Sequence, residues 1–168
     1  LTAQYGFPYL PLSNYEVNPE IANIIPQRIA RQYMLVPIDK IGNNLIIFEL
    51  VGEMGAGKTY FTKYLGEVLG IAKKIVSPTF SLCNEYDFKV KGHPLKLYHI
   101  DTHRLYSEGE MEGLEPDRIF KSPNIVSIEW ANKISGFMKK YSHGALVVRI
   151  FIEHKTETER NFMYKIVL

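Results

Sequence analysis

Residues 45–59 read LIIFELVGEMGAGKT, an apolar, β-forming run that leads directly into a glycine-rich loop, and the next residues, YFTKYLGEVLG, suit a helix. Gly52, Gly57, Lys58 and Thr59 fit the spacing G-x-x-x-x-G-K-[ST], in which backbone N–H groups turn toward the phosphates of a nucleotide. The alternative is an ordinary glycine-rich turn before a helix. The strand before it and the helix after it favour a phosphate-binding loop.

This loop predicts specific roles for its last two residues. We expect Lys58 to reach the β- and γ-phosphates and Thr59, the first hydroxyl after the lysine, to hold Mg²⁺. The N-terminus of the following helix adds a partial positive charge beside the anion. The sequence therefore predicts a site for a nucleotide and Mg²⁺.

The composition is that of a globular protein, with 168 residues, 46% hydrophobic and 23% charged. The net charge of +2 neither requires nor excludes nucleic acid. One cysteine, Cys83, excludes an internal disulfide framework and a zinc site of the usual spacing. No apolar run reaches membrane-spanning length, and the first ten residues lack the features of a signal peptide. We therefore expect a cytoplasmic protein without membrane insertion.

Two further segments predict strands with an acid at the carboxyl end. LKLYHID ends at Asp101, and NIVSIEW contains Glu129 beside Trp130. Ligands bind at the carboxyl ends of strands in open α/β sheets, so both acids are candidate Mg²⁺ carboxylates, beside the phosphate loop if the strands are adjacent. A turn or helix cap is the alternative for Asp101, and packing is the alternative for Trp130. His99 and His103 flank Asp101, and a strand end between them argues against a metal-binding pair.

The rest of the pattern predicts the remaining elements. Residues 77–79 (SPT) form a loop, and residues 80–88 alternate as a strand. The acidic segment 107–120 predicts two short helices. Residues 145–155 and 161–168 predict two closing strands, an antiparallel pair at the sheet edge.

Residues 1–44 differ from the rest because prolines divide them into short elements. Asn18 and Pro19 predict the start of a short helix, and the turn at residues 42–44 marks a boundary. We therefore predict a packed N-terminal appendage at 1–44 and a domain at 45–168. The appendage, with its QYGFPY motif, weakly resembles the N-terminal domain of type II secretion and type IV pilus ATPases. A natural fusion and an artificial junction would explain it equally.

Four ordered blocks, GEMGAGKT (52–59), SPTFSLCNEYDF (77–88), LYHIDTHRLY (97–106) and SIEW (127–130), together resemble the TsaE (YjeE) family. The resemblance runs from about Ile46 to the C-terminus. It implies a small ATPase that works with TsaB and TsaD in forming threonylcarbamoyladenosine in tRNAs that read codons beginning with A. It thus implies ATP and Mg²⁺ as cofactors, and tRNA as an indirect partner.

The resemblance also implies site residues. Lys58, Asp101 and Glu129 would be catalytic, and Thr59, Asp101 and Glu129 would hold Mg²⁺. The expected nucleotide-binding residues are Gly52, Glu53, Met54, Gly55, Ala56, Gly57, Lys58, Thr59 and Thr79. The expected partner-facing or switch residues are Ser77, Pro78, Glu85, Tyr86 and Trp130. In this family a short helical segment before the first strand contributes contacts to adenine, and here the appendage stands in its place.

We therefore predict a three-layer α/β P-loop NTPase with a mainly parallel sheet, antiparallel closing strands and a small N-terminal appendage. The expected activity is ATP hydrolysis with a low basal rate that partners raise, since the sequence shows no obvious arginine finger. Arg104 is the nearest candidate, and a surface or ion-pair role is its alternative. Two alternatives stay open. One is a non-catalytic nucleotide-binding module of a secretion or pilus system, and the other is a small P-loop kinase, although no arginine-rich lid segment follows Glu112.

Overall fold

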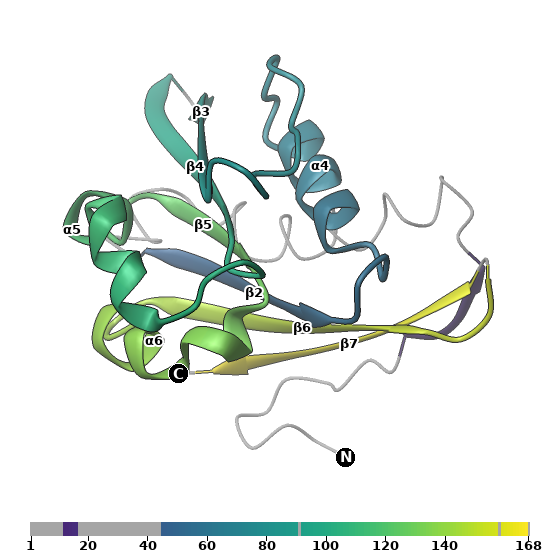
Figure 1. Cartoon of the computed structure of the whole chain (residues 1–168). Helices are drawn as coiled ribbons and strands as arrows, with labels where there is room; N and C mark the ends of the chain where they lie inside the picture. The colour runs from purple at the N-terminus through teal and green to yellow at the C-terminus, as the bar shows by residue number, and fades with distance from the viewer. Residues whose placement is uncertain (1–11, 17–44, 91, 158, 168) are drawn as a thin grey trace.

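The computed structural model describes residues 12–16, 45–90, 92–157 and 159–167, which form one seven-stranded sheet with helices on both faces (Figure 1). The strands are β1 (Leu12–Glu16), β2 (Ile46–Gly52), β3 (Cys83–Val90), β4 (His93–Asp101), β5 (Ile125–Glu129), β6 (Leu146–His154) and β7 (Glu159–Val167). The helices are α4 (Lys58–Val68), α5 (Pro116–Ile119) and α6 (Ser135–Tyr141), with the 3-10 helices η1 (Glu108–Leu114) and η2 (Ala131–Ile134).

The strand order is β1-β7-β6-β2-β5-β4-β3. The central strands β6, β2, β5 and β4 run parallel, whereas β3, β7 and β1 pair antiparallel with their neighbours. The predicted α/β fold with antiparallel closing strands is therefore confirmed. One detail differs from the sequence-based expectation: β1 pairs outside β7, so the closing pair is not the edge. The order also answers a point that the sequence left open, since β5 lies next to β2 and separates it from β4.

Strand β2 is buried on both faces, which explains why its sequence is a nearly continuous apolar run. Ile46, Phe48 and Leu50 belong to the core beneath α4, where Leu65 of the helix packs against the sheet. Ile47 points into the core of the opposite face. The phosphate-loop strand is thus the centre of both hydrophobic layers.

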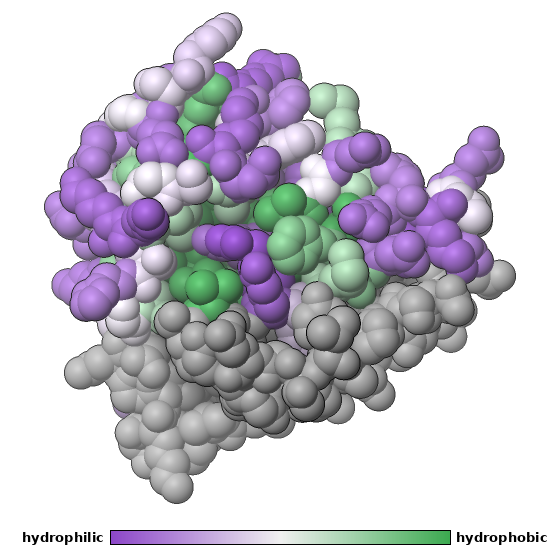
Figure 2. All heavy atoms as spheres, turned by 90° about the horizontal axis from the view of Figure 1, so that it is seen from below, coloured by the Kyte–Doolittle hydropathy of each residue, from purple (hydrophilic) through white to green (hydrophobic). Residues whose placement is uncertain are grey.

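The opposite face is covered by η1, α5, η2 and α6, which completes the three layers (Figure 1). Met111, Ile119, Ile134 and Phe137 supply the buried side chains of these helices. The two short helices expected in the acidic segment are therefore present as η1 and α5. Viewed from below, the surface shows apolar side chains between hydrophilic ones (Figure 2).

The strand expected to begin at Phe80 begins instead at Cys83. Leu82 has φ 60°, in the left-handed region, which ends extended pairing ahead of it. Phe80 is 87% exposed, so it does not belong to the alternating pattern. Tyr86 and Phe88 are buried as that pattern requires.

Most of the predicted appendage lies outside the described residues. This applies to the helix start at Asn18 and Pro19, to the turn at 42–44 and to the packing of the segment. Residues 12–16 are the exception, because β1 pairs with β7. In the described part of the chain, no helix is long and apolar enough to cross a membrane.

Close packing of β2 against β6 predicts that any side chain at Gly52 lowers the stability of the fold. A Cβ at Gly52 would lie 2.3 Å from the backbone oxygen of Ile152, so β6 would have to move. We expect Gly52→Ala to lower the free energy of unfolding by about 1–3 kcal/mol in urea titrations. Gly113→Ala is the control, because its Cβ would meet nothing within 4 Å, and it should change stability by less than about 0.5 kcal/mol. Equal stability of the two variants would contradict this packing.

Candidate functional site

The loop between β2 and α4 has the backbone geometry of an anion site. Gly55 and Gly57 have φ of 75° and 110°, conformations that favour glycine. α4 begins at Lys58, and its first turn has neither a side-chain cap nor an acidic residue. The N–H groups of this turn are therefore directed toward the loop without competition from a side chain.

Lys58 is folded into this loop. Its side chain is buried, and its Nζ donates to the carbonyl oxygens of Gly52 and Glu53, both at 2.7 Å. Burial lowers the pKa of Lys58, while the carboxylates of Glu129 and Asp101 act in the opposite direction. An ammonium group has three N–H donors, so one remains for a further acceptor.

Glu129 connects the loop helix to the neighbouring strands. It ends β5, next to β2, and it is 4% exposed. Its Oε1 accepts a hydrogen bond from Thr59 Oγ1 at 2.6 Å and lies 2.8 Å from His99 Nε2. The structure thus brings together the predicted pair Thr59 and Glu129, and it adds His99.

Asp101 lies beside Glu129, because the two are paired in the register of β4 and β5. Its Oδ2 accepts from Thr79 Oγ1 and its Oδ1 from the backbone N–H of His103, both at 2.9 Å. In the described ranges, there is no group of three or more His, Cys, Asp or Glu side chains placed so that they could hold a metal ion by themselves. A threonine hydroxyl and two carboxylates nevertheless provide the hard oxygen donors that suit Mg²⁺.

The expected switch loop is attached to the site at one end and to β3 at the other. Thr79 contacts Asp101, and the hydroxyls of Ser77 and Thr79 lie 2.6 Å apart. At the start of the loop, the N–H of Val76 donates to Tyr86 Oη at 3.2 Å. Tyr86 is only 2% exposed. Tyr86 therefore supports the loop from within the core. Of the two other expected switch residues in this loop, Ser77 is exposed and Pro78 is buried.

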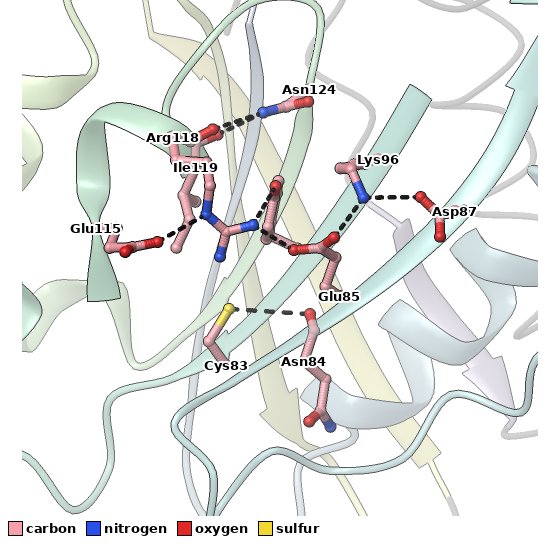
Figure 3. Close-up of polar contacts among 10 residues, drawn as sticks. Cys83, Asn84, Glu85, Asp87, Lys96, Glu115, Arg118, Ile119 and Asn124 are labelled. Carbon is pink, nitrogen blue, oxygen red and sulfur yellow. Dashed lines mark hydrogen bonds and ion pairs between the residues drawn. The ribbon is translucent and has the colours of Figure 1, made fainter. Parts of the chain in front are cut away.

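Glu85 belongs to a network of ion pairs on the β3–β4 hairpin (Figure 3). It accepts hydrogen bonds from Lys96 and, at 2.6 Å, from Arg118 Nη1. Lys96 also binds Asp87 at 2.8 Å, and Arg118 Nε donates to Glu115 at 3.0 Å. The bonds from Lys96 and Arg118 hold the pKa of Glu85 below its ordinary value. The network connects the hairpin to α5.

Trp130 follows Glu129 and reaches the loop. Its backbone has φ 60°, and its ring centre lies 4.0 Å from Lys58 Nζ and 5.0 Å from the ring of His103. A cation over an indole ring is attracted to it. The single tryptophan of the chain is therefore part of the candidate site.

Two arginines lie near the site, one that the sequence predicted as a finger candidate and one that it did not. Arg104, the expected finger candidate, stacks on the ring of Phe80 at 4.6 Å. Arg160 of β7, which the sequence analysis did not consider, lies 3.5 Å from the carbonyl oxygen of Gly55 through its Nη2. No local signal pointed to Arg160, because its approach depends on the β6–β7 hairpin.

The loop adjoins a hollow that is lined by both apolar and polar residues. A cavity of about 640 Å³ adjoins the loop, and its wall includes Gly52, Met54, Trp130 and Phe151. Five large apolar side chains of the described residues are exposed, on the loop, on the first turn of α4, and in the loops before β3 and after β4. They are Met54, Tyr60, Val76, Phe80 and Tyr106.

The thiol of Cys83, the partly buried first residue of β3, gives a test of the packing around β3 that is independent of any ligand. Burial raises its pKa to about 11. Because only the thiolate is alkylated, the native rate with iodoacetamide should rise about tenfold per pH unit between pH 8 and 10. At pH 8 it should be about 100-fold below the rate in urea, where the thiol has an ordinary pKa. Equal rates in both conditions would contradict the burial of Cys83.

Comparison with known proteins identifies the family of the chain. The family model described as threonylcarbamoyl adenosine biosynthesis protein TsaE matches residues 22–162. The tRNA threonylcarbamoyladenosine biosynthesis protein TsaE of Bacillus subtilis is 42% identical over 88 residues, 52% of this chain and 52% of that protein. The chain thus spans about half the length of the curated relatives it matches. The crystal structure of Bacillus subtilis YdiB aligns with a TM-score of 0.61 and 25% identity, over 96% of this chain and 89% of that one.

A second, partial similarity accompanies the first. The type IV pilus assembly ATPase PilB of Myxococcus xanthus is 34% identical over 47 residues, 28% of this chain and 8% of that protein. The expected weak likeness to pilus ATPases is thus found. The TsaE match covers far more of the chain and includes the loop, both strand-end acids and Trp130. This chain belongs to the TsaE family, as its four ordered sequence blocks predict.

Proposed function

We propose that this protein binds and hydrolyses ATP, and that it does so in the formation of threonylcarbamoyladenosine in tRNA. The observation that carries the proposal is the meeting of Lys58 and Thr59, at the start of α4, with Glu129 and Asp101, at the ends of two parallel strands. Membership of the TsaE family supports the link to tRNA modification.

In this proposal, Lys58 uses its remaining N–H donor for a phosphate oxygen, and the first-turn N–H groups of α4 bind the same anion. Bound Mg²⁺ would neutralise the charge that develops on the phosphates. Thr59 can donate its proton to Glu129 and still offer an oxygen lone pair to the metal. Since phosphoryl transfer requires little covalent work from the protein, these residues act by positioning and by charge.

Asp101 would order the metal or the attacking water. Its bond to Thr79 connects that role to the loop at residues 77–79. A change around Asp101 when nucleotide binds would therefore reach the exposed part of this loop. Thr79 is the only member of the proposed nucleotide-binding set outside the loop at 52–59.

The proposed partners are TsaB and TsaD homologues, with tRNA reached through that complex. The support in this structure is that Met54 of the loop, Tyr60 next to Thr59 and Phe80 next to Thr79 are exposed, because exposed apolar surface marks interaction sites. Arg104 stacks on one of them, Phe80. A partner that covers these side chains would change the surroundings of the loop and could raise a low basal rate.

The similarity to PilB supports a second candidate, a nucleotide-binding module that docks on a secretion or pilus component. Pull-down of the full chain against pilus components and against TsaB and TsaD separates the two. Retention by TsaB and TsaD alone is the result expected from the main proposal.

Replacement of Lys58 tests nucleotide binding. Lys58→Ala removes a charged donor, so we expect ADP to bind about 10- to 100-fold more weakly and ATP turnover to be lost. Titration of Trp130 fluorescence measures the first, and phosphate release the second. Lys63→Ala is the control, because this lysine of the same helix lies over Tyr60 instead. Unchanged turnover in Lys58→Ala would refute the ATPase proposal.

The tRNA pathway is tested in cells depleted of their own TsaE. We expect the chain to restore threonylcarbamoyladenosine in hydrolysed tRNA, as measured by mass spectrometry, and Lys58→Ala to fail at equal protein level. Absence of the modified nucleoside with the folded, abundant chain would exclude this role while leaving ATP binding intact.

A further inference from the structure

His99 lies completely buried in β4, at the centre of the site yet outside the predicted set. Its Nε2 is 2.8 Å from Glu129 Oε1, the same oxygen that accepts the hydroxyl of Thr59. In the register of the sheet, His99 is opposite Ser127, two residues before Glu129. The imidazole therefore reaches along β5 to the carboxylate.

The chemistry of the pair defines which atom carries the proton. An ionised carboxylate is only an acceptor, so His99 Nε2 must be the donor. His99 Nδ1 is then a buried atom for which no hydrogen-bond partner is found among the described residues. Burial of an unpaired polar atom costs free energy, so a residue selected only for packing would not be a histidine.

We propose that His99 is a positioning residue that holds Glu129 against Thr59 for Mg²⁺ binding. The proposal rests on the proposed function, because it assigns His99 a role at the nucleotide-bound metal. The bond to Nε2 limits rotation of the carboxylate, so that Oε1 stays beside Thr59 Oγ1. Without it, the bond from Thr59 alone would hold the carboxylate of Glu129, which would then be freer to rotate.

This orientation matters because a metal requires its ligands at defined positions. Partners that orient metal ligands typically change metal affinity about 10- to 100-fold when they are removed. Among the described residues, His99 bonds to Glu129 and not to the phosphate loop, whereas Glu129 contacts Thr59 directly. Its loss should therefore weaken Mg²⁺ binding and leave metal-free nucleotide binding nearly unchanged.

The chain offers a matched control for simple loss of a buried hydrogen bond. Thr62 Oγ1 and Ser127 Oγ lie 2.8 Å apart between α4 and β5, and both residues are fully buried. Ser127→Ala removes this bond two residues before Glu129 without touching the carboxylate. It should lower stability while leaving the Mg²⁺ requirement unchanged.

The test compares His99→Asn, His99→Gln and Ser127→Ala in the full chain. The amide nitrogen of Gln can take the position of Nε2. The side chain of Asn is one methylene shorter, so its amide nitrogen does not reach Glu129. Trp130 fluorescence is titrated with ADP at several Mg²⁺ concentrations and in EDTA, and urea unfolding checks the fold. We expect His99→Asn to raise the half-saturating Mg²⁺ concentration about tenfold or more, with ADP affinity in EDTA unchanged, and His99→Gln to retain most of the wild-type affinity.

Three results would overturn the proposal. The first is wild-type Mg²⁺ dependence in His99→Asn, the second is equal weakening of ADP binding in EDTA, and the third is the same Mg²⁺ shift in Ser127→Ala. If His99→Asn does not fold, His99→Leu, which fills the volume without a polar atom, replaces it with the same expected shift. Failure of the wild-type chain to bind ADP at all would instead refute the proposed function, and this inference with it.

Discussion

The buried carboxylate of Glu129 is the group on which the geometry of the site depends. A charge with 4% exposure is stable only when hydrogen bonds replace the water it has lost. Thr59, from the first turn of α4, and His99, from the middle of β4, provide those bonds. These two hydrogen bonds to Glu129 connect α4 and β4 to β5, which lies between the loop strand β2 and β4.

That arrangement gives each strand-end acid a different task. Glu129 is on the strand next to β2 and contacts the helix that follows the loop. Asp101 is one strand further away and contacts Thr79, from the loop before β3. The inner acid thus serves the metal site proposed here, and the outer acid connects that site to an exposed loop that Tyr86 supports from the core.

Exposed apolar side chains lie on loops next to the proposed nucleotide site. Phe80 and Tyr106 are 87% and 99% exposed, although Leu105, next to Tyr106, is buried. Water-exposed aromatic surface is unfavourable for an isolated protein, whereas a partner that covers it gains from its burial. The loops next to the proposed nucleotide site therefore also carry the surface proposed for partners, so that occupancy of one can influence the other.

The loop, its strand and its helix could be predicted from the sequence because they depend on residues close together in the chain. Glycines that permit φ of 75° and 110°, an apolar run buried on both faces and Lys58 at a helix start are local signals. The position of Glu129 at a strand end was also predicted from the sequence. The order of the strands, the approach of Arg160 to Gly55 and the bond from His99 to Glu129 were not. Those features arise from contacts between residues 30 to 105 positions apart, and alternation along one strand contains no information about which strand will lie beside it. Only the tertiary structure could decide them, because strand order is selected by the packing of the whole sheet.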